Sequence, residues 1–252
     1  MKSWAVCAAW VCSLVVGGAV ASAQESSFTR TESGFVYVVT GVEDVEAIAR
    51  SVPGIAEGSA LVDQSVLSNQ VDEQNAVRRS VLQGSLQNNV GIFMVNQDAG
   101  NLNNQANVRI LVLAEGGSLA QELSLAGVTR RIGNSVISSG GSREARIVGS
   151  FGGTVGIVGV NQSAGNLTQQ ANVAVIGIGL VLGPDASLLG DTSLGVISAG
   201  NTLIRGSTAP EAAVLTDSFA GFRGIAQVNQ STSDGNIARN FLGLSLTVLD
   251  VR

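Results

Sequence analysis

The sequence predicts an all-β protein, organised as a β-solenoid or stacked array of three β-repeat units behind a short N-terminal leader. Three observations support this prediction. One Asn/Gln/Gly-rich motif recurs three times along the chain. Glycine is abundant, at 32 residues, whereas only 3 prolines occur, so long strands are not interrupted. Glycine and β-branched residues crowd every segment of the repeat, which disfavours helices.

The first residues have the pattern of a secretory signal peptide. Lys2 provides a positive start, residues 4–20 form an apolar run, and Ala-Ser-Ala at 21–23 matches a small-residue cleavage site. The apolar run is short for a membrane anchor, which is the alternative. We therefore predict a signal peptide over 1–23 and a mature chain that starts at Gln24.

Removal of this segment also removes both cysteines, Cys7 and Cys12, and the chain contains no histidine. Ser/His and Cys/His nucleophiles and the usual zinc sites are therefore excluded. We predict that the protein is not an enzyme and has no cofactor and no small-molecule substrate. Arginine is the only basic side chain left, and the full sequence has a formal net charge of −5, so no nucleic-acid partner is expected.

A leader over 24–63 is predicted to precede the repeats. Residues 35–39 read as a single strand. Residues 42–50 have acidic side chains early and Arg50 late, with apolar residues on one side, which predicts a short helix. The ends of a repeat array need protection, so the leader is expected to cap the first repeat.

The three copies of the motif define the repeats. They read GIFMVNQDAGNLNNQANV over 91–108, GIVGVNQSAGNLTQQANV over 156–173 and GIAQVNQSTSDGNIARN over 224–240. The second copy follows the first by 65 positions without a gap, and the third is interpreted as carrying a two-residue insertion before Gly235-Asn236. Extending the similarity predicts repeat 1 over 64–125, repeat 2 over 134–192 and a degenerate repeat 3 over 194–252.

Each unit is predicted to contain a strand, a Gly-Asn turn and a second strand. In the first copy, 90–95 is a β-prone run that stops at Asn-Gln, and a second run covers 105–113. Ala-Gly-Asn between them is turn chemistry, because glycine and asparagine tolerate positive φ. Further upstream, 65–68, 135–138 and 195–198 are interpreted as equivalent segments.

No unit can bury its apolar side alone, so the three units are expected to stack and to place equivalent residues in columns. Stacked amides can hydrogen-bond along such a column. A buried amide without a partner costs about 1–3 kcal/mol, which favours the same polar residue in every copy. The predicted assembly residues are Asn96, Gln97, Gly100, Asn101, Gln105, Asn107, Asn161, Gln162, Gly165, Asn166, Gln170, Asn172, Asn229, Gln230, Gly235 and Asn236.

The segment VNQSAGNLTQQAN over 160–172, with its copy over 95–107, resembles the repeat motif of the Fap functional-amyloid fimbriae and, more distantly, curli subunits. The resemblance implies a secreted subunit that polymerises into β-rich fibres of a biofilm matrix. Its partners would be further copies or related fibre subunits and an outer-membrane secretion machinery. Its place would be extracellular or at the cell surface, reached through the periplasm in a two-membrane bacterium.

Fap fibre subunits carry a cysteine pair near the C-terminus, and residues 241–252 contain none. A minor or nucleating subunit is therefore one expected role. A monomeric β-solenoid adhesin or surface-binding protein is the alternative that the residues leave open.

Overall fold

The computed structural model describes residues 11–16, 20–21, 25–26, 31–32, 34–37, 40–52, 55–116, 119–181, 186–206 and 210–249. Every regular element in these ranges is a β-strand, which confirms the predicted all-β class. Across the same ranges, no helical stretch has the length and apolarity needed to cross a membrane.

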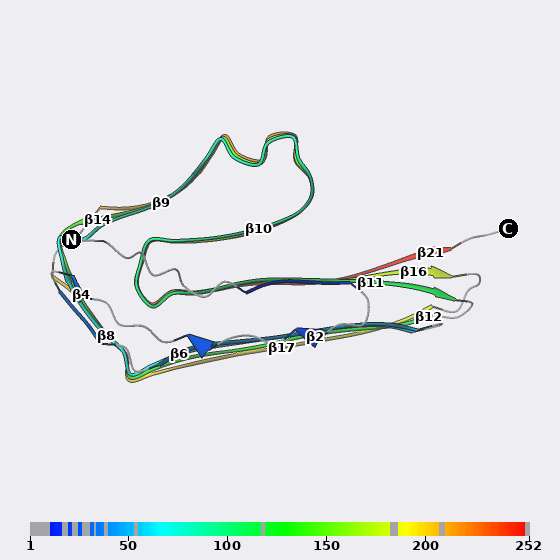
Figure 1. The fold of residues 1–252 in the computed structure, drawn as a ribbon, viewed down its shortest axis with the longest axis horizontal. Coiled ribbons are helices and arrows are strands. Elements are labelled where there is room, and N and C mark those ends of the chain that lie inside the picture. The colour runs from blue at the N-terminus through cyan, green and yellow to red at the C-terminus, as the bar shows by residue number, and fades with distance from the viewer. Residues whose placement is uncertain are drawn as a thin grey trace.

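The chain winds through three successive layers, which we call rungs, and each rung contains five strands. The first rung contains β7 (Ile55–Leu67), β8 (Gln70–Gln74), β9 (Val77–Gln83), β10 (Val90–Asp98) and β11 (Asn104–Gly116). The second contains β12 (Leu119–Ile132), β13 (Ser135–Ser139), β14 (Ser142–Val148), β15 (Val155–Ser163) and β16 (Gln169–Val181). The third contains β17 (Ala186–Ala199), β18 (Thr202–Arg205), β19 (Glu211–Thr216), β20 (Arg223–Ser231) and β21 (Ile237–Leu249). Figure 1 shows that the three rungs follow nearly the same outline.

Each strand pairs in parallel with its equivalent in the next rung, so five parallel sheets run along the stack. In the sheet β10-β15-β20, Asn96 pairs with Asn161 and Asn161 with Asn229. The two strands that flank the Gly-Asn turn do not pair with each other, because β10 and β11 belong to different sheets. They form an arch. The backbone of each strand bonds to the equivalent strand of the next rung, and side chains of the two strands meet inside the arch, as Asn107 does with Asn96. In the view down the stack, β11 lies between β10 and the sheet that contains β6, β12 and β17 (Figure 1).

The strand register corrects two alignments made from sequence. The third motif carries no insertion: Arg223–Ser231 and Ile237–Leu249 both lie 68 positions after their partners in the second rung. The turn between them therefore has substitutions rather than extra residues. Upstream, 65–67 pairs with 130–132, and 135–138 pairs with 70–73 and 202–205, so the predicted equivalence of 65–68 with 135–138 was wrong. Short Ser/Val-rich segments recur on more than one side of a rung, which explains the error.

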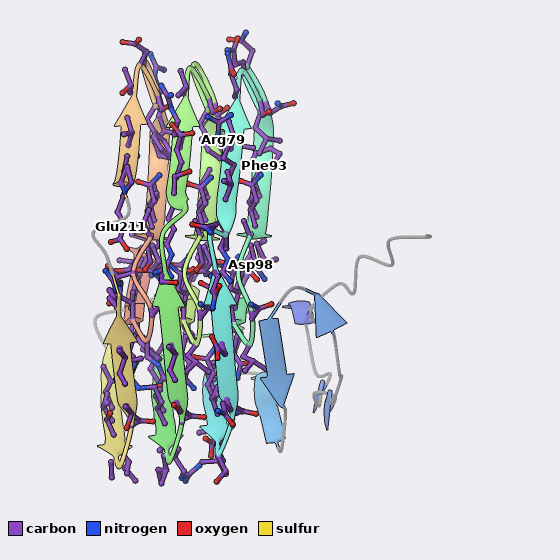
Figure 2. The ribbon with its side chains drawn as sticks, turned by 90° about the vertical axis from the view of Figure 1, so that its left-hand side faces the viewer. Arg79, Phe93, Asp98 and Glu211 are labelled. Atoms are coloured by element: carbon purple, nitrogen blue, oxygen red, sulfur yellow. The ribbon has the colours of Figure 1, made fainter. Side chains whose placement is uncertain are left out.

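The leader contributes antiparallel strands to one end of the stack. Its longer members are β5 (Gly34–Tyr37), which pairs with β8, and β6 (Thr40–Val52), which pairs with β7. The remaining N-terminal strands are β1 (Val11–Val16) against β11, β2 (Val20–Ala21) and β3 (Glu25–Ser26) against β6, and β4 (Thr31–Glu32) against β5. Figure 2 shows the leader strands, in blue, beside the first rung. β1 and β2 lie within 1–23, and the cleavage of that segment stays a prediction.

The helix predicted over 42–50 is wrong, because these residues lie inside β6. The outer edge of β7 carries a row of backbone N–H and C=O groups that need partners. All 13 residues of β6 pair with those of β7, from Thr40↔Leu67 to Val52↔Ile55. This continuous ladder overrides the weak local preference for a helix.

The apolar core divides into clusters on the inner side of the rungs. One cluster contains Ile147, Phe151, Val158 and Val160, all buried in the second rung, with partly buried partners from the first and third rungs packed against it. Phe151 stacks on Phe219 of the third rung with ring centroids 4.8 Å apart. Stacking equivalent residues thus extends apolar contacts along the same axis as the hydrogen bonds.

Candidate functional site: polar columns along the stacking axis

Two columns of asparagine line the inside of the arch between β10 and β11. In the first, the side chain of Asn161 donates to Asn96 Oδ1 at 3.0 Å, and Asn229 donates to Asn161 Oδ1 at 3.0 Å. In the second, Asn172 donates to Asn107 Oδ1 at 3.0 Å. The columns also bond to each other within a rung, since Asn172 donates to Asn161 Oδ1 at 2.9 Å. The result is a two-column amide network that is satisfied along and across the axis.

A glutamine column lies next to these and ties the arch to the neighbouring sheet. Gln162 donates to Gln97 Oε1 at 2.8 Å and Gln230 donates to Gln162 Oε1 at 2.8 Å. Each glutamine also reaches backbone oxygens of the β9-β14-β19 sheet, as Gln162 does at Ser80 and Arg146. Adjacent residues of β10 point to opposite faces, so Asn96 faces β11 while Gln97 faces β9.

The Gly-Asn turn is stacked as closely as the strands. A Cβ on Gly100 would overlap the carbonyl oxygen of Gly165, and one on Gly165 would overlap that of Ser233. Glycine is therefore required by close approach, and the positive φ that sequence placed here occurs instead at Leu102 (58°) and Leu167 (53°). These leucines are buried, with Val66, Val71 and Val136 around them.

The third turn keeps the shape with different residues. The backbone N–H of Asn166 donates to Asp234 Oδ1 at 2.8 Å, as that of Asn101 does to Asn166 Oδ1 at 3.1 Å. Asp234 therefore takes the place predicted for Asn236, and Gly235 takes that of Leu167, with a φ of 67°. Asn236 lies elsewhere in the turn and donates to Ser231 at 2.6 Å.

The remaining predicted column is interrupted. Gln105 donates to Gln170 Oε1 at 2.9 Å, but Ala238 occupies the next position in the third rung. The loss of this amide, together with the changed turn, explains why the third motif looks degenerate in the sequence.

Among the polar columns, sequence reasoning missed three parts: the last residue of one column, one whole column and one residue of the third turn. Asn240 extends the second column by donating to Asn172 Oδ1 at 2.9 Å. A separate column stands at the corner between β7 and β8, where Asn69 donates to Asn134 at 3.1 Å and Asn134 to Asn201 at 2.8 Å. The signal for it was present, because Asn69 and Asn134 are separated by the same 65 positions as the motif copies. The third missed member is Asp234, hidden by the insertion that sequence alignment introduced.

Asp98 differs from the serines that occupy its position in the second and third rungs, Ser163 and Ser231. More than a third of the residue surface is open to solvent, but its carboxyl is enclosed by neighbouring atoms of the turn. Desolvation is the largest effect on it and raises its pKa to about 6, against the opposing hydrogen bonds from Asn103 and the Gly100 N–H. The first rung therefore carries a carboxyl group that titrates near neutral pH.

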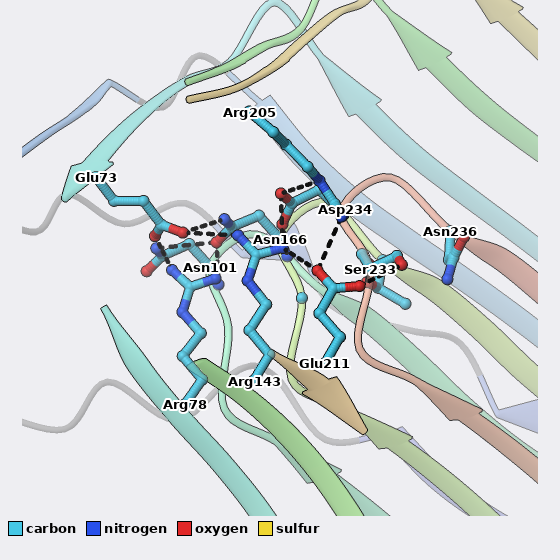
Figure 3. A network of polar contacts seen from close by, with 12 residues as sticks. Glu73, Arg78, Asn101, Arg143, Asn166, Arg205, Glu211, Ser233, Asp234 and Asn236 are labelled. Atoms are coloured by element: carbon cyan, nitrogen blue, oxygen red, sulfur yellow. Dashed lines mark hydrogen bonds and ion pairs between the residues drawn. The ribbon is translucent and has the colours of Figure 1, made fainter. Parts of the chain in front are cut away.

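A group of charged residues, which we call the ionic cluster, lies where β8, β9 and the turn meet in successive rungs (Figure 3). Glu73 forms ion pairs with Arg78 of its own rung and, at 3.0 Å, with Arg143 of the second rung. Arg143 is 5 % exposed and also pairs with Asp234 at 2.8 Å and Glu211 at 3.4 Å. Desolvation lowers the pKa of Arg78, and the Glu73 carboxylate opposes that effect. The Arg78–Glu73 pair thus lies within the first rung, whereas the three pairs of Arg143 join the second rung to the first and the third.

The arrangement offers stacked donors and acceptors. Within the described ranges, no group of three or more His, Cys, Asp or Glu side chains is placed to hold a metal ion. Residues 158–177 of the second rung, which carry its polar columns, are buried throughout, whereas the equivalent stretches of the first and third rungs are partly exposed.

Two comparisons with known proteins bear on the identity of the chain. No solved structure matches its fold. The model of the functional amyloid protein FapB/FapC family matches residues 59–247, a range that holds the polar columns and the ionic cluster of all three rungs. The chain therefore belongs to the functional amyloid protein FapB/FapC family.

Proposed function

We propose that the chain is a secreted subunit of an amyloid-like fibre in an extracellular biofilm matrix, and that it assembles by stacking its rungs on those of neighbouring copies. Membership of a functional amyloid family supports a role as a fibre component. The Asn/Gln/Gly columns named above are the proposed assembly residues. Related fibre subunits and an outer-membrane secretion machinery are the proposed partners.

One observation carries the proposal: among the strands that the structure describes, none covers the third rung at the end of the stack. In the described part of the chain, each of β17, β18, β19, β20 and β21 has a partner strand on one side only. Large apolar side chains on this rung are exposed, among them Val196 at 60 % and Leu246 at 52 %. Parallel edges of this length are templates for further strands.

The first rung favours a second candidate function, a monomeric β-solenoid adhesin. The edges of β7 and β8 are covered by β6 and β5 of the leader, so one end of the stack is partly protected. A protected end is what a soluble repeat protein needs. The two candidates differ in whether the uncovered third rung accepts another copy.

Incubation of the mature chain from Gln24 tests the proposal. We expect fibres by electron microscopy that give a meridional reflection near ~4.7 Å, the spacing of hydrogen-bonded strands. A mature chain that stays monomeric for days, with and without preformed seeds, would contradict the fibre function and leave the adhesin.

A pair of double variants tests whether the columns drive assembly. Asn161→Ala with Gln162→Ala removes fully buried amides from the middle rung. Asn229→Ala with Gln230→Ala removes the same pair from the end rung, where Asn229 is 6 % exposed. We expect the first variant to assemble more slowly than the second, and equal rates would argue against a leading role for the inner columns.

A further inference from the structure

We propose, on the basis of the proposed fibre function, that the ionic cluster recognises a second copy of this chain and fixes how it docks. Arg205 and Glu211 of the third rung would pair with Glu73 and Arg78 of the first rung of the next copy. The partner is thus a copy stacked in the same direction, head to tail, with the strands in register.

The strand register places the charges of the cluster in three columns. The first column runs Glu73, Ser138, Arg205 along β8, β13 and β18. The second runs Arg78, Arg143, Glu211 along β9, β14 and β19. The third runs Asn101, Asn166, Asp234 through the turns. In the first two columns, the residue of the first rung and the residue of the third rung have opposite charges.

The contacts inside the chain show that these columns interact from rung to rung. Arg143 reaches back to Glu73 at 3.0 Å and forward to Asp234 at 2.8 Å. It is therefore a cation held between anions of the rungs on either side. Each contact crosses a step of one strand spacing, about 4.7–4.9 Å.

The end of the stack lacks such a second neighbour. Arg205 pairs within its own rung with Glu211 at 2.9 Å, and its side chain is 42 % exposed, whereas Arg143 is 5 % exposed. Glu211 keeps 21 % of its side chain exposed. Figure 2 shows Glu211 at the free side of the third rung. The uncovered face thus presents a cation from the first column beside an anion from the second.

A copy added by repeating the rung step meets this face with the opposite pattern. Its Glu73 lies over Arg205 and its Arg78 lies over Glu211, so both columns place unlike charges in contact. A shift by one column would put Arg78 over Arg205 and two cations would meet. Desolvated like charges disfavour such a joint, and matched charges specify register and partner more than they add affinity.

The leader occupies part of the surface that this joint uses. β5 pairs with β8, and Gly34 is the register partner of Glu73. A parallel neighbour can reach β8 only when β5 leaves it, whereas the outer edges of β9 and β10 have no partner strand in the described part of the chain. The leader and the incoming copy therefore compete for β7 and β8.

Reciprocal charge reversals in the full mature chain test the joint. One variant is Arg205→Glu with Glu211→Arg, and the other is Glu73→Arg with Arg78→Glu. When one variant is present alone, two of its copies meet at the joint with like charges in both columns. We expect seeded elongation of each single variant to slow by about tenfold or more. In a 1:1 mixture every alternating joint is matched again, and we expect elongation to return to within about twofold of the unmodified chain.

The control is Arg79→Glu with Glu144→Arg, which reverses an ion pair between the first two rungs whose column ends in Ala212. It carries no charge match across the joint and is expected to elongate like the unmodified chain. Thermal unfolding of each monomer checks the fold, and the neutral variant Arg205→Gln with Glu211→Gln replaces any reversal that does not fold. This variant is expected to elongate more slowly and to lose the salt dependence of the rate.

The outcomes separate the joint from the fibre function. Recovery in the mixture supports the charge-matched joint. Reversed variants that elongate alone like the unmodified chain, or a mixture no faster than its components, would overturn it while fibres of the unmodified chain still uphold the fibre function. An unmodified chain that forms no fibres overturns both.

Discussion

Replacement of Asn161 by alanine tests how much one buried amide of the middle rung contributes to stability. Its side chain is fully buried and takes part in four hydrogen bonds: it donates to Asn96 at 3.0 Å and Ala106 at 2.7 Å, and accepts from Asn172 at 2.9 Å and Asn229 at 3.0 Å. At about 0.5–1.5 kcal/mol each, the four bonds amount to roughly 2–6 kcal/mol. The partners retain some other bonds, so we expect a loss of about 3 kcal/mol.

Denaturant unfolding of freshly prepared monomer at low concentration, followed by far-ultraviolet circular dichroism, measures this loss. Asn229→Ala is the matched variant in the third rung, whose strand β20 has a partner on one side only, so that solvent can enter from the open side once the amide is removed; it should cost about half as much or less. Asn89→Ala is the surface control, because Asn89 is exposed and donates only to the Gln87 carbonyl, and should cost at most about 0.5 kcal/mol. A loss below about 1 kcal/mol for Asn161→Ala, or equal losses for Asn161 and Asn229, would refute the account of the stacked columns.

Three further predictions concern the turn, the acidic group of the first rung and the leader. Gly165→Ala should destabilise the monomer by about 1–3 kcal/mol in the same unfolding assay, because its Cβ would overlap the Ser233 carbonyl oxygen. Gly152→Ala is the control and should be tolerated, because the nearest atom to its Cβ is 3.7 Å away. Equal losses of stability would contradict the requirement for glycine in the turn. The folded-state pKa of Asp98 is raised to about 6, so its contribution to stability is present at low pH and is lost as the pH rises from about 4 through 6. The free energy of unfolding of Asp98→Asn should lack this loss over the same pH range. Parallel pH curves for both proteins would argue against the raised pKa. Glu46 and Leu61 are register partners in β6 and β7 and are close enough for a disulfide. When oxidised, the double variant Glu46→Cys with Leu61→Cys should hold β6 on β7 and stop elongation from seeds until the disulfide is reduced. Equal elongation rates in the oxidised and reduced forms would mean that the leader does not leave β7 during assembly.

Much of the architecture could be predicted because a repeated sequence must satisfy the same contacts at the same positions. Ile92, Val95, Asn96 and Gln97 recur together, 65 positions later in the second copy and a further 68 positions later in the third, and in the structure they stand in register with these counterparts. Identical residues at identical places are what parallel, in-register stacking needs, since every amide then meets an amide. The repeated motif alone is therefore enough to predict which residues of β10, β15 and β20 share a column.

The third turn and the leader could not be predicted in the same way. Nothing in the letters STSDGN distinguishes an inserted pair from substitutions, and only the unbroken register shows that Asp234 stands where Asn166 does. Residues 42–50 are equally compatible with a helix by local pattern, and the unpaired edge of β7 decides for a strand. In both places the outcome depends on a neighbour distant in the chain.

The sequence by itself determined that this protein is an all-β repeat whose polar residues return in the same order in each copy, because a repeated motif can be recognised from the chain alone. Only the tertiary structure decided which residues share a column. The charged residues illustrate the difference. Glu73, Arg78, Arg143, Arg205 and Glu211 show no common motif in the sequence, and they meet because the rungs place distant positions one strand spacing apart. Charge pairing acts through space, so the match between the first and third rungs becomes visible only once the stack is formed.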